Sequence, residues 1–253
     1  MTAKTKNYIY GRYSVKTDIG KIRLNNEDRA LALTNTRGNI LLAVCDGMGG
    51  QNKGDLAASL AIQAVSQAFQ EKDRFSHKIF ARHWVSSLIR RINSDIFRQA
   101  SSSPNYQGMG TTITLVLIVN DYVVVAQVGD SRAYSLRNRN LSQITEDQTY
   151  VQYLYRIGEI SKEEIATHPK RHILMNALGI YPSLDVDIKV YPYMNDSILV
   201  CSDGLYNNVP DKDLLTILKG GDTPDQKVNE LISLANVNGG SDNIAVVLWE
   251  AKE

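Results

Sequence analysis

The chain is poor in the residues that mark several common classes of protein. It has only two cysteines, Cys45 and Cys201, in 253 residues, and two cysteines alone make neither a disulfide framework nor a zinc site. Of the four histidines, His77 and His83 are six apart in one predicted helix, which does not place both on one metal. There is no Gly-x-Ser-x-Gly nucleophile elbow and no Gly-x-x-x-x-Gly-Lys-Ser/Thr phosphate loop. The sequence thus shows no sign of thiol, serine-nucleophile or P-loop chemistry, and both cysteines are interpreted as small buried hydrophobes.

An excess of charge and long apolar runs are also missing. With 28 Lys and Arg against 27 Asp and Glu, the formal net charge is +1, which argues against a protein that binds nucleic acid or an anionic membrane through its charge. The first residues lack the apolar core of a signal peptide, and the longest apolar runs fall far short of the roughly 20 residues that span a bilayer. We expect a cytoplasmic monomer that binds neither nucleic acid nor membrane.

What the chain does have is the composition of a globular protein, with 43% hydrophobic and 22% charged residues. No repeat or long linker interrupts it, so we expect one domain over residues 1–253. Strands grouped with strands, and helices in pairs, predict an α+β fold of antiparallel sheets with helices packed outside. The strand patterns lie at about 13–15, 29–33, 39–45, 111–119, 122–128, 131–136, 141–144, 185–191, 197–201 and 244–249, and the helix patterns at 55–69, 77–96, 211–218 and 224–235.

Two local patterns make more specific predictions. Ile22 and Leu24 alternate with polar neighbours, which predicts a short strand whose other face carries Arg23. On local grounds Arg23 is either a surface residue or a clamp for phosphate, since guanidinium binds tetrahedral oxyanions with a fork of donors. In the second helix, the apolar face predicted to be buried includes Ile79 and Phe80.

Acidic residues recur where predicted strands begin or end. Glu27-Asp28 follows one predicted strand, Asp46, Asp130 and Asp203 each end another, and Asp242 precedes the last strand. Burying a carboxylate without a partner costs several kcal/mol, so a carboxylate at these strand ends is expected to have a partner or a ligand. If they converge, they form an all-oxygen cluster that would select Mg²⁺, Mn²⁺ or Ca²⁺ over Zn²⁺.

Each of these pieces also has an ordinary structural explanation. A single Asp-Gly is most often a β-turn, and Glu27-Asp28 beside Arg29 is typical of a solvated loop. Asp130 could form an ion pair with Arg132 at the end of its strand. Only the joint pattern indicates a site.

Seven short motifs place these residues in a recognisable order. The pattern closely resembles the metal-dependent type 2C serine/threonine protein phosphatases, the PPM family, and its bacterial branch in particular. The resemblance covers about residues 11–250, and seven motifs in order are highly specific although each alone is modest. The motifs are Asp18-Ile-Gly20, Arg23-Leu-Asn-Asn-Glu-Asp28, Val44-Cys-Asp-Gly-Met-Gly-Gly50, Gly108-Met-Gly-Thr-Thr112, Val128-Gly-Asp-Ser-Arg132, Cys201-Ser-Asp-Gly204 and Gly240-Ser-Asp-Asn243.

The resemblance implies a four-layer αββα sandwich, in which two antiparallel sheets are flanked by helix pairs. It implies a site for two Mn²⁺ or Mg²⁺ ions at one edge of the sandwich. Matched by motif position, Asp46 would bridge both metals, Gly47 would offer its carbonyl, Asp203 and Asp242 would hold one metal, and Glu27 would serve the other directly or through water.

Further roles follow from the same resemblance. Asp28 would orient metal-bound water, and Arg23 would bind the substrate phosphate. Bacterial members often bind a third metal, whose ligands match Asp130 and Asp203. Some members carry a histidine at the position of Met48, credited with protonating the leaving oxygen. With Met48 there, the general acid is unassigned, and metal-bound water is the default.

The implied activity is hydrolysis of phosphoserine and phosphothreonine in proteins by a metal-activated water, without a covalent phosphoenzyme. The partners would be phosphorylated proteins, and a bacterial serine/threonine kinase would be counteracted. A segment at about 146–180 resembles the family's flap beside the active site. Two alternatives stay open: a noncatalytic member that binds phosphoproteins or regulators, and a calcium-stabilised interaction domain. The intact set Asp46, Asp203 and Asp242 argues against the first, and the lack of a contiguous calcium loop argues against the second.

Overall fold

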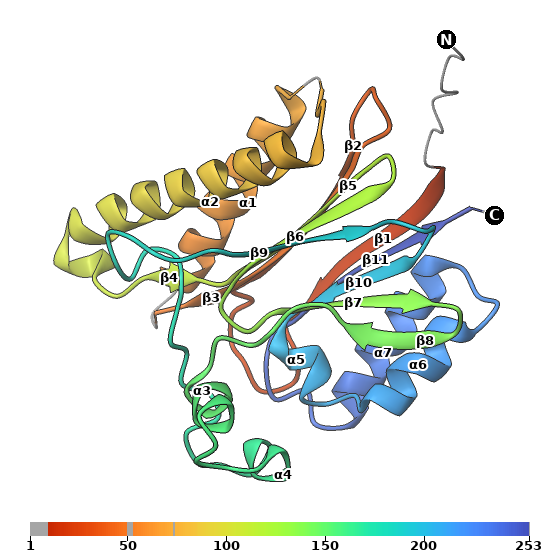
Figure 1. Cartoon of the computed structure of the whole chain (residues 1–253). Coiled ribbons are helices and arrows are strands. Elements are labelled where there is room, and N and C mark those ends of the chain that lie inside the picture. The colour runs from red at the N-terminus through yellow and green to blue at the C-terminus, as the bar shows by residue number, and fades with distance from the viewer. Residues whose placement is uncertain (1–9, 50–52, 73, 253) are drawn as a thin grey trace.

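Two antiparallel sheets pack face to face, and each is assembled from distant parts of the chain (Figure 1). The computed structural model describes residues 10–49, 53–72 and 74–252. One sheet has the strand order β1 (Gly11–Asp18), β11 (Ile244–Ala251), β10 (Ser197–Cys201), β7 (Arg132–Arg137), β8 (Asn140–Gln143). The other has the order β2 (Asp28–Thr34), β3 (Ile40–Met48), β5 (Ile113–Val119), β6 (Tyr122–Val128), β9 (Asp187–Pro192), and β4 (Gly110–Thr111) pairs with the end of β3.

The uninterrupted apolar run of β3 is explained by burial on both of its faces. Side chains alternate across a strand, so Ile40, Leu42 and Val44 enter the core between the two sheets. Leu41, Ala43 and Cys45 point the other way, into a core shared with helices. A strand that is covered on both sides does not alternate apolar and polar residues. The first charged residue of β3 is Asp46, which lies where the strand reaches the edge of the sandwich.

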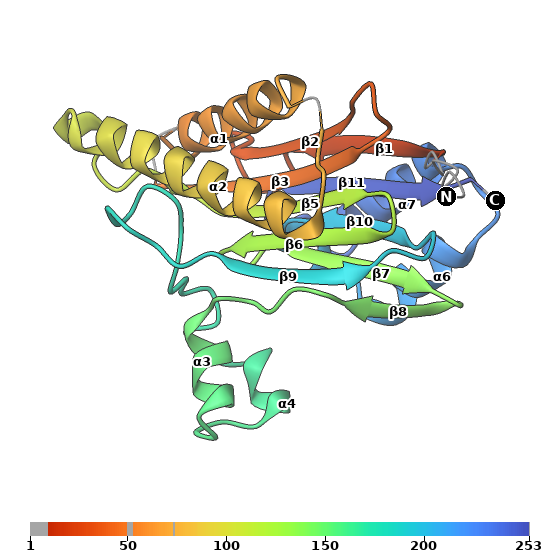
Figure 2. The same cartoon turned by 45° about the horizontal axis from the view of Figure 1, so that its top comes forward.

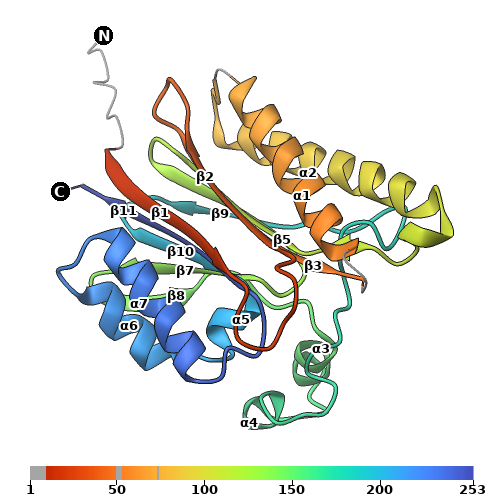
Figure 3. The same ribbon diagram turned by 180° about the vertical axis from the view of Figure 1, so that it is seen from behind.

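Helices cover both outer faces (Figures 2 and 3). The helices α1 (Lys53–Gln70) and α2 (Lys78–Ser101) pack on the sheet that contains β3. On the other sheet lie α5 (Asp203–Tyr206), α6 (Asp211–Lys219) and α7 (Pro224–Val237). The predicted α+β fold, a four-layer αββα sandwich, is confirmed. Within the described ranges, no helix has both the length and the apolar content needed to cross a membrane.

The segment between β8 and β9 stands away from the sandwich (Figure 2). It contains α3 (Tyr150–Arg156) and α4 (Lys162–Ile165) and lies within the flap-like segment expected at about 146–180. On its return the chain pairs with Thr111: the Leu178 N–H donates to the Thr111 carbonyl at 2.9 Å. Thr111 belongs to β4, which follows a one-turn 3₁₀ helix, η1 (Pro104–Tyr106), and it lies opposite Gly47 of β3. The insertion is therefore anchored close to the end of β3.

The strand predicted around Ile22 and Leu24 is wrong. These residues lie in a turn, and their side chains are 68% and 92% exposed. The Asn243 side chain donates to the carbonyls of Ile19 and Asn25, both at 2.9 Å. The loop backbone is thus held by a distant amide side chain and not by a strand partner.

The buried face of α2 also differs from the prediction. Ile79 and Phe80 are both 65% exposed, because they lie off the buried stripe, which begins at the fully buried Ala81. Val85, Ile89 and Ile92 form the buried stripe, at the 3–4-residue spacing of an amphipathic helix.

Candidate metal centre

Asp46 lies where β3 reaches the edge of the sandwich, directly opposite Asp28 of β2. Its backbone is held by two threonines. The Asp46 N–H donates to Thr112 Oγ1 at 3.0 Å, and its carbonyl accepts from Thr112 N at 2.8 Å and from Thr111 Oγ1 at 2.9 Å. Three bonds to one residue fix the height at which the Asp46 carboxylate leaves the sheet.

Gly47 and Glu27 are brought together through their backbones. The Gly47 N–H donates to the Glu27 carbonyl at 3.2 Å. A side chain at position 47 would place its Cβ 2.7 Å from that carbonyl oxygen and would also collide with the backbone of Gly54 in α1. Glycine is therefore required here by close packing, and the loop before β2 lies against the end of β3.

Asp28 joins the two sheets. Its side chain is 1% exposed, and Oδ2 accepts a 2.6 Å hydrogen bond from Ser202 Oγ, which follows β10 of the opposite sheet. The same Ser202 oxygen accepts from Ala245 N at 2.8 Å. One buried hydroxyl thus connects β2, β10 and β11 at the edge where the carboxylates gather.

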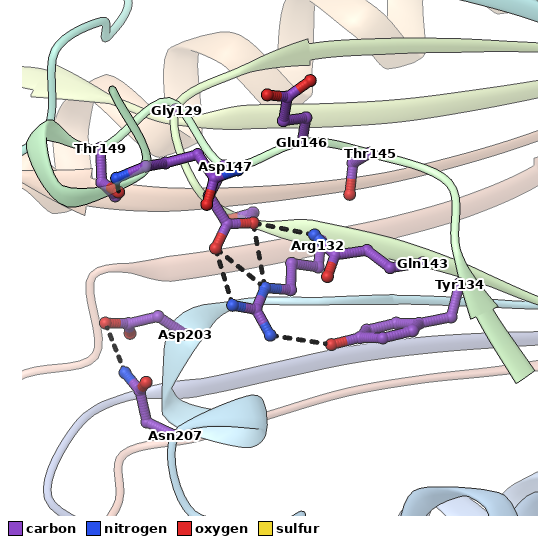
Figure 4. Close-up of polar contacts among 12 residues, drawn as sticks. Gly129, Arg132, Tyr134, Gln143, Thr145, Glu146, Asp147, Thr149, Asp203 and Asn207 are labelled. Carbon is purple, nitrogen blue, oxygen red and sulfur yellow. Dashed lines mark hydrogen bonds and ion pairs between the residues drawn. The ribbon is translucent and has the colours of Figure 1, made fainter. Parts of the chain in front are cut away.

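Asp203 and Asp242 reach this edge from the sheet that contains β11. Asp203 is the first residue of α5, and its Oδ2 accepts from Asn207 Nδ2 at 3.1 Å (Figure 4). Its Oδ1 is buried and finds no hydrogen-bond partner in residues 10–49, 53–72 and 74–252. Asp242 accepts a 2.7 Å hydrogen bond from Arg23 Nη2. The guanidinium of Arg23 therefore lies beside these carboxylates, although the loop that carries it is exposed.

Asp130 is 8% exposed and follows β6 in a tight turn. Gly129 makes this turn with φ of +99° and lies against the Thr112 side chain. The ion pair between Asp130 and Arg132 that the sequence allowed is not formed. Arg132 makes its ion pair with Asp147, at 2.7 Å between Nη2 and Oδ2.

Five aspartates of this edge, Asp28, Asp46, Asp130, Asp203 and Asp242, are named the carboxylate cluster below. Burial raises the pKa of Asp28 and of Asp130, each to about 8, and that of Asp203 to about 6, with neighbouring carboxylates adding to each shift. Burial also raises the pKa of Asp46 well above its usual range, and the charges of the other four members raise it further. These groups are close enough to repel one another, so the cluster favours either bound protons or bound cations.

The donor set fits divalent cations. It offers only oxygen, which suits Mg²⁺ and Mn²⁺, and the buried, unpartnered Oδ1 of Asp203 is the kind of atom that a cation satisfies. As they stand, no three Asp, Glu, His or Cys side chains of the described ranges are gathered tightly enough to enclose an ion. Asp242 is turned to Arg23 instead.

Both cysteines lie beside this edge, and both are free and fully buried, as predicted. Burial raises the pKa of each thiol, so both stay protonated and chemically quiet.

Several supporting residues carry no assignment from sequence. Thr111, Thr112, Ser202 and Asn243 are neutral, and hydroxyl or amide side chains show no charge pattern that would mark them. All four lie inside the motifs quoted above, and this position in the motifs is the feature of the sequence that could have indicated their role. Their partners in the bonds described above are 43 to 224 residues away along the chain, so only the folded register identifies them.

The sequence and the fold of the chain match those of known proteins. The profile of the family described as Protein phosphatase 2C matches residues 21–219. The serine/threonine phosphatase stp of Listeria monocytogenes serovar 1/2a is 40% identical over 236 residues, which are 93% of this chain and 94% of that protein. The structure of Stp1 from Staphylococcus aureus is similar with a TM-score of 0.92 and 30% identity over 100% of both chains.

A further solved structure bears on the cofactor. The catalytic domain of the phosphatase PstP, in complex with two manganese ions, is similar with a TM-score of 0.84 and 33% identity, over 96% of this chain and 99% of that one. Together with the family match and the shared fold, these relatives show that the chain belongs to the protein phosphatase 2C family and is a serine/threonine protein phosphatase.

Proposed function

We propose that the carboxylate cluster, with Glu27 and Gly47, binds two divalent cations, Mn²⁺ or Mg²⁺, and that water attacks the phosphorus of phosphoserine and phosphothreonine directly. The observation that carries this proposal is the buried, unpartnered Oδ1 of Asp203 among carboxylates whose pKa values are raised. Two cations at such a site lower the pKa of water and stabilise in-line displacement at phosphorus. No covalent phosphoenzyme is required.

The chain's own residues have distinct tasks in this proposal. Asp46 and the Gly47 carbonyl lie at the centre, held by Thr111 and Thr112. Asp203 and Asp242 supply carboxylates from the opposite sheet, and Glu27 supplies one from the loop before β2. Asp28, fixed by Ser202, orients a water.

Arg23 binds the substrate phosphate. Its guanidinium is about half exposed and is paired with Asp242. A cation held by Asp242 competes with Arg23 for that carboxylate, which frees the fork of donors for a phosphate oxygen.

Asp130 and Asp203 are proposed to share a third cation. Asp130 and the Oδ1 atom of Asp203 are buried, and after burial the charge of Asp203 is the largest cause of the raised pKa of Asp130. A cation between them would relieve this repulsion.

The partners proposed for this site are phosphorylated proteins. The relatives are named serine/threonine phosphatases, and the chain is proposed to act as a single phosphatase domain, a monomer that counteracts a serine/threonine kinase. The segment 146–180 would be its flap, because it is anchored beside Asp46 through Thr111 and Leu178.

Phosphate release from a phosphothreonine peptide, measured across a series of Mn²⁺ and Mg²⁺ concentrations, tests the proposal. We expect turnover that requires the metal and disappears with a chelator. A folded protein that binds Mn²⁺ without turnover would indicate a noncatalytic member instead. A protein stabilised by Ca²⁺ but inactive with every divalent metal would indicate the calcium-stabilised interaction domain.

A further inference from the structure

Arg132 is the first residue of β7, and all three nitrogens of its guanidinium have hydrogen-bond partners (Figure 4). Nε lies 3.0 and 3.1 Å from the two oxygens of Asp147, and Nη2 lies 2.7 Å from Oδ2 of the same carboxylate. Nη1 donates to the Tyr134 hydroxyl at 3.2 Å. The flat face of the guanidinium lies 3.6 Å from the centre of the Tyr206 ring, a stacking contact that lysine cannot reproduce.

These contacts join three pieces of the chain that the sequence keeps far apart. Arg132 belongs to β7, Asp147 stands at the root of the flap segment, and Tyr206 is the last residue of α5. The root is tied further by Gln143 Nε2, which donates to Asp147 Oδ1 at 2.9 Å, and by the Gln148 N–H, which donates to the Gly129 carbonyl at 3.0 Å.

The helix α5 depends on contacts of this kind. It has four residues, Asp203–Tyr206, and a helix of one turn has no stability of its own. Its first residue carries the unpartnered Oδ1, and its last residue is stacked on Arg132. The direction of Asp203 Oδ1 is therefore set at one end by the Ser202–Asp28 bond and at the other end by the Arg132–Tyr206 contact.

The surroundings of the ion pair suit a rigid link. The side chains of Arg132 and Asp147 are 22% and 14% exposed, so water competes weakly for their bonds.

We propose that Arg132 is a positioning residue that locks the flap root to α5 and thereby keeps Asp203 Oδ1 directed into the carboxylate cluster. The role in metal binding rests on the proposed function of Asp203. The mechanical link between residues 147 and 206 does not, and it can be measured in metal-free protein.

The chain contains a matched control on the same strand. Arg137 is the last residue of β7 and also binds an aspartate with two donors: Nε and Nη2 lie 2.6 Å from the two oxygens of Asp196. This pair joins β7 to the turn before β10, at the end of the strand away from the carboxylate cluster. A purely structural Arg–Asp pair should behave as Arg137 does.

The test compares Arg132→Lys with Arg137→Lys in the full chain. Each variant keeps its positive charge and loses the planar fork. Amide exchange in metal-free protein is followed at Gln148 in the flap root and at Asn207, whose N–H donates to the Asp203 carbonyl at 2.9 Å. We expect Arg132→Lys to speed exchange at both amides and Arg137→Lys at neither. Unchanged exchange at both amides in Arg132→Lys overturns the link.

A second variant, Tyr206→Leu, separates the two arms of the link. It removes the stacking contact and keeps the Arg132–Asp147 pair, so exchange should rise at Asn207 and not at Gln148. Calorimetric Mn²⁺ titration should show roughly tenfold weaker binding in both Arg132→Lys and Tyr206→Leu, the size expected when the support of a metal ligand is lost. Wild-type Mn²⁺ affinity in both variants overturns the positioning role. Absence of Mn²⁺ binding in the wild type instead overturns the proposed function, and the exchange result still decides the link.

Discussion

The two carboxylate oxygens of Asp203 have different surroundings. Oδ2 is bound by Asn207, whereas Oδ1 is buried without a partner. Replacing this residue by asparagine keeps the shape and the contact with Asn207 but removes a charge that opposes Asp242. The consequence for stability and the consequence for activity should therefore have opposite directions.

We expect Asp203→Asn to lower turnover by more than the roughly 10–100-fold lost when an outer partner of a metal ligand is removed. The melting temperature without metal should stay the same or rise, because like-charge repulsion is relieved. Asp211→Asn is the control, since Asp211 is likewise the first residue of its helix, α6, but is exposed. Wild-type turnover of Asp203→Asn at saturating Mn²⁺ would contradict its assignment as a ligand.

Arg23 makes a second prediction at this scale. Arg23→Ala should mainly raise KM for a phosphopeptide, because a charged hydrogen bond to phosphate contributes about 1.5–3 kcal/mol, or roughly 10–100-fold in affinity. Lys21→Ala removes a neighbouring cation of the same exposed loop and serves as the control. Equal losses in steady-state kinetics of the two variants would show that diffuse charge, and not a directed clamp, attracts the substrate.

The sequence predicted the charged members of the site better than their supports. Asp46, Asp203 and Asp242 could be predicted because charge at strand ends is costly and the motifs name them. The partner of Arg132 could not be predicted: Asp130 is two residues away along the chain, but the side chain of Arg132 turns to the helix-covered face with Tyr134 and meets Asp147 there. Local spacing does not reveal which face of a strand end meets which loop.

At the scale of elements, the edge that carries the carboxylates depends on a few bonds between sheets. Ser202 is fully buried and links β2, β10 and β11 by donating to Asp28 and accepting from Ala245 N. This hydroxyl therefore affects both the stability of the fold and the orientation of Asp28.

Ser202→Ala should lower the free energy of unfolding by about 1–3 kcal/mol, because a buried acceptor and a buried donor lose their partner. Turnover should fall as well, since Asp28 is no longer held. Thr145→Val is the matched control: its buried hydroxyl accepts from Ala133 N at 3.0 Å, away from the cluster. Urea unfolding and steady-state kinetics at saturating Mn²⁺ decide, and equal turnover in both variants would make Ser202 a structural residue only.

Elements with strong periodicity were predictable, and those made by distant side chains were not. The predicted strands at 39–45, 111–119 and 122–128 lie next to one another in one sheet, the second of them as β5 (Ile113–Val119), and Asn120 lies in the turn between the last two with φ of +51°. Ile22 and Leu24 alternate with polar residues over only a few positions, and Asn243 holds the loop that contains them. Alternation over a few residues does not outweigh such a bond from the other end of the chain.

At the scale of the whole molecule, protons bound to the cluster stabilise the native state and compete with metal binding, so both folding and metal binding depend on pH. The native state holds the pKa of Asp28 and Asp130 at about 8 and that of Asp203 at about 6, chiefly through burial, whereas in the unfolded chain these groups return to about 4. Between these values the native state binds more protons than the unfolded state. Stability without metal must therefore fall as the pH rises from about 5 to 8.

We expect the metal-free protein to lose at least about 4 kcal/mol of unfolding free energy between pH 5 and pH 8, because one carboxyl with a native pKa of about 8 already loses about 1.4 kcal/mol per pH unit over this range. Mn²⁺ should reverse the trend, because cations replace protons more readily as the pH rises. Urea unfolding at pH 5, 6.5 and 8, with Mn²⁺ and with chelator, measures both effects. In Asp203→Asn the metal-free slope should be shallower, because one titrating member is gone. A metal-free stability that is flat or rises over this range would mean that the carboxylates are ionised and accommodated without cations, and the physical argument for a metal centre at this edge would fail.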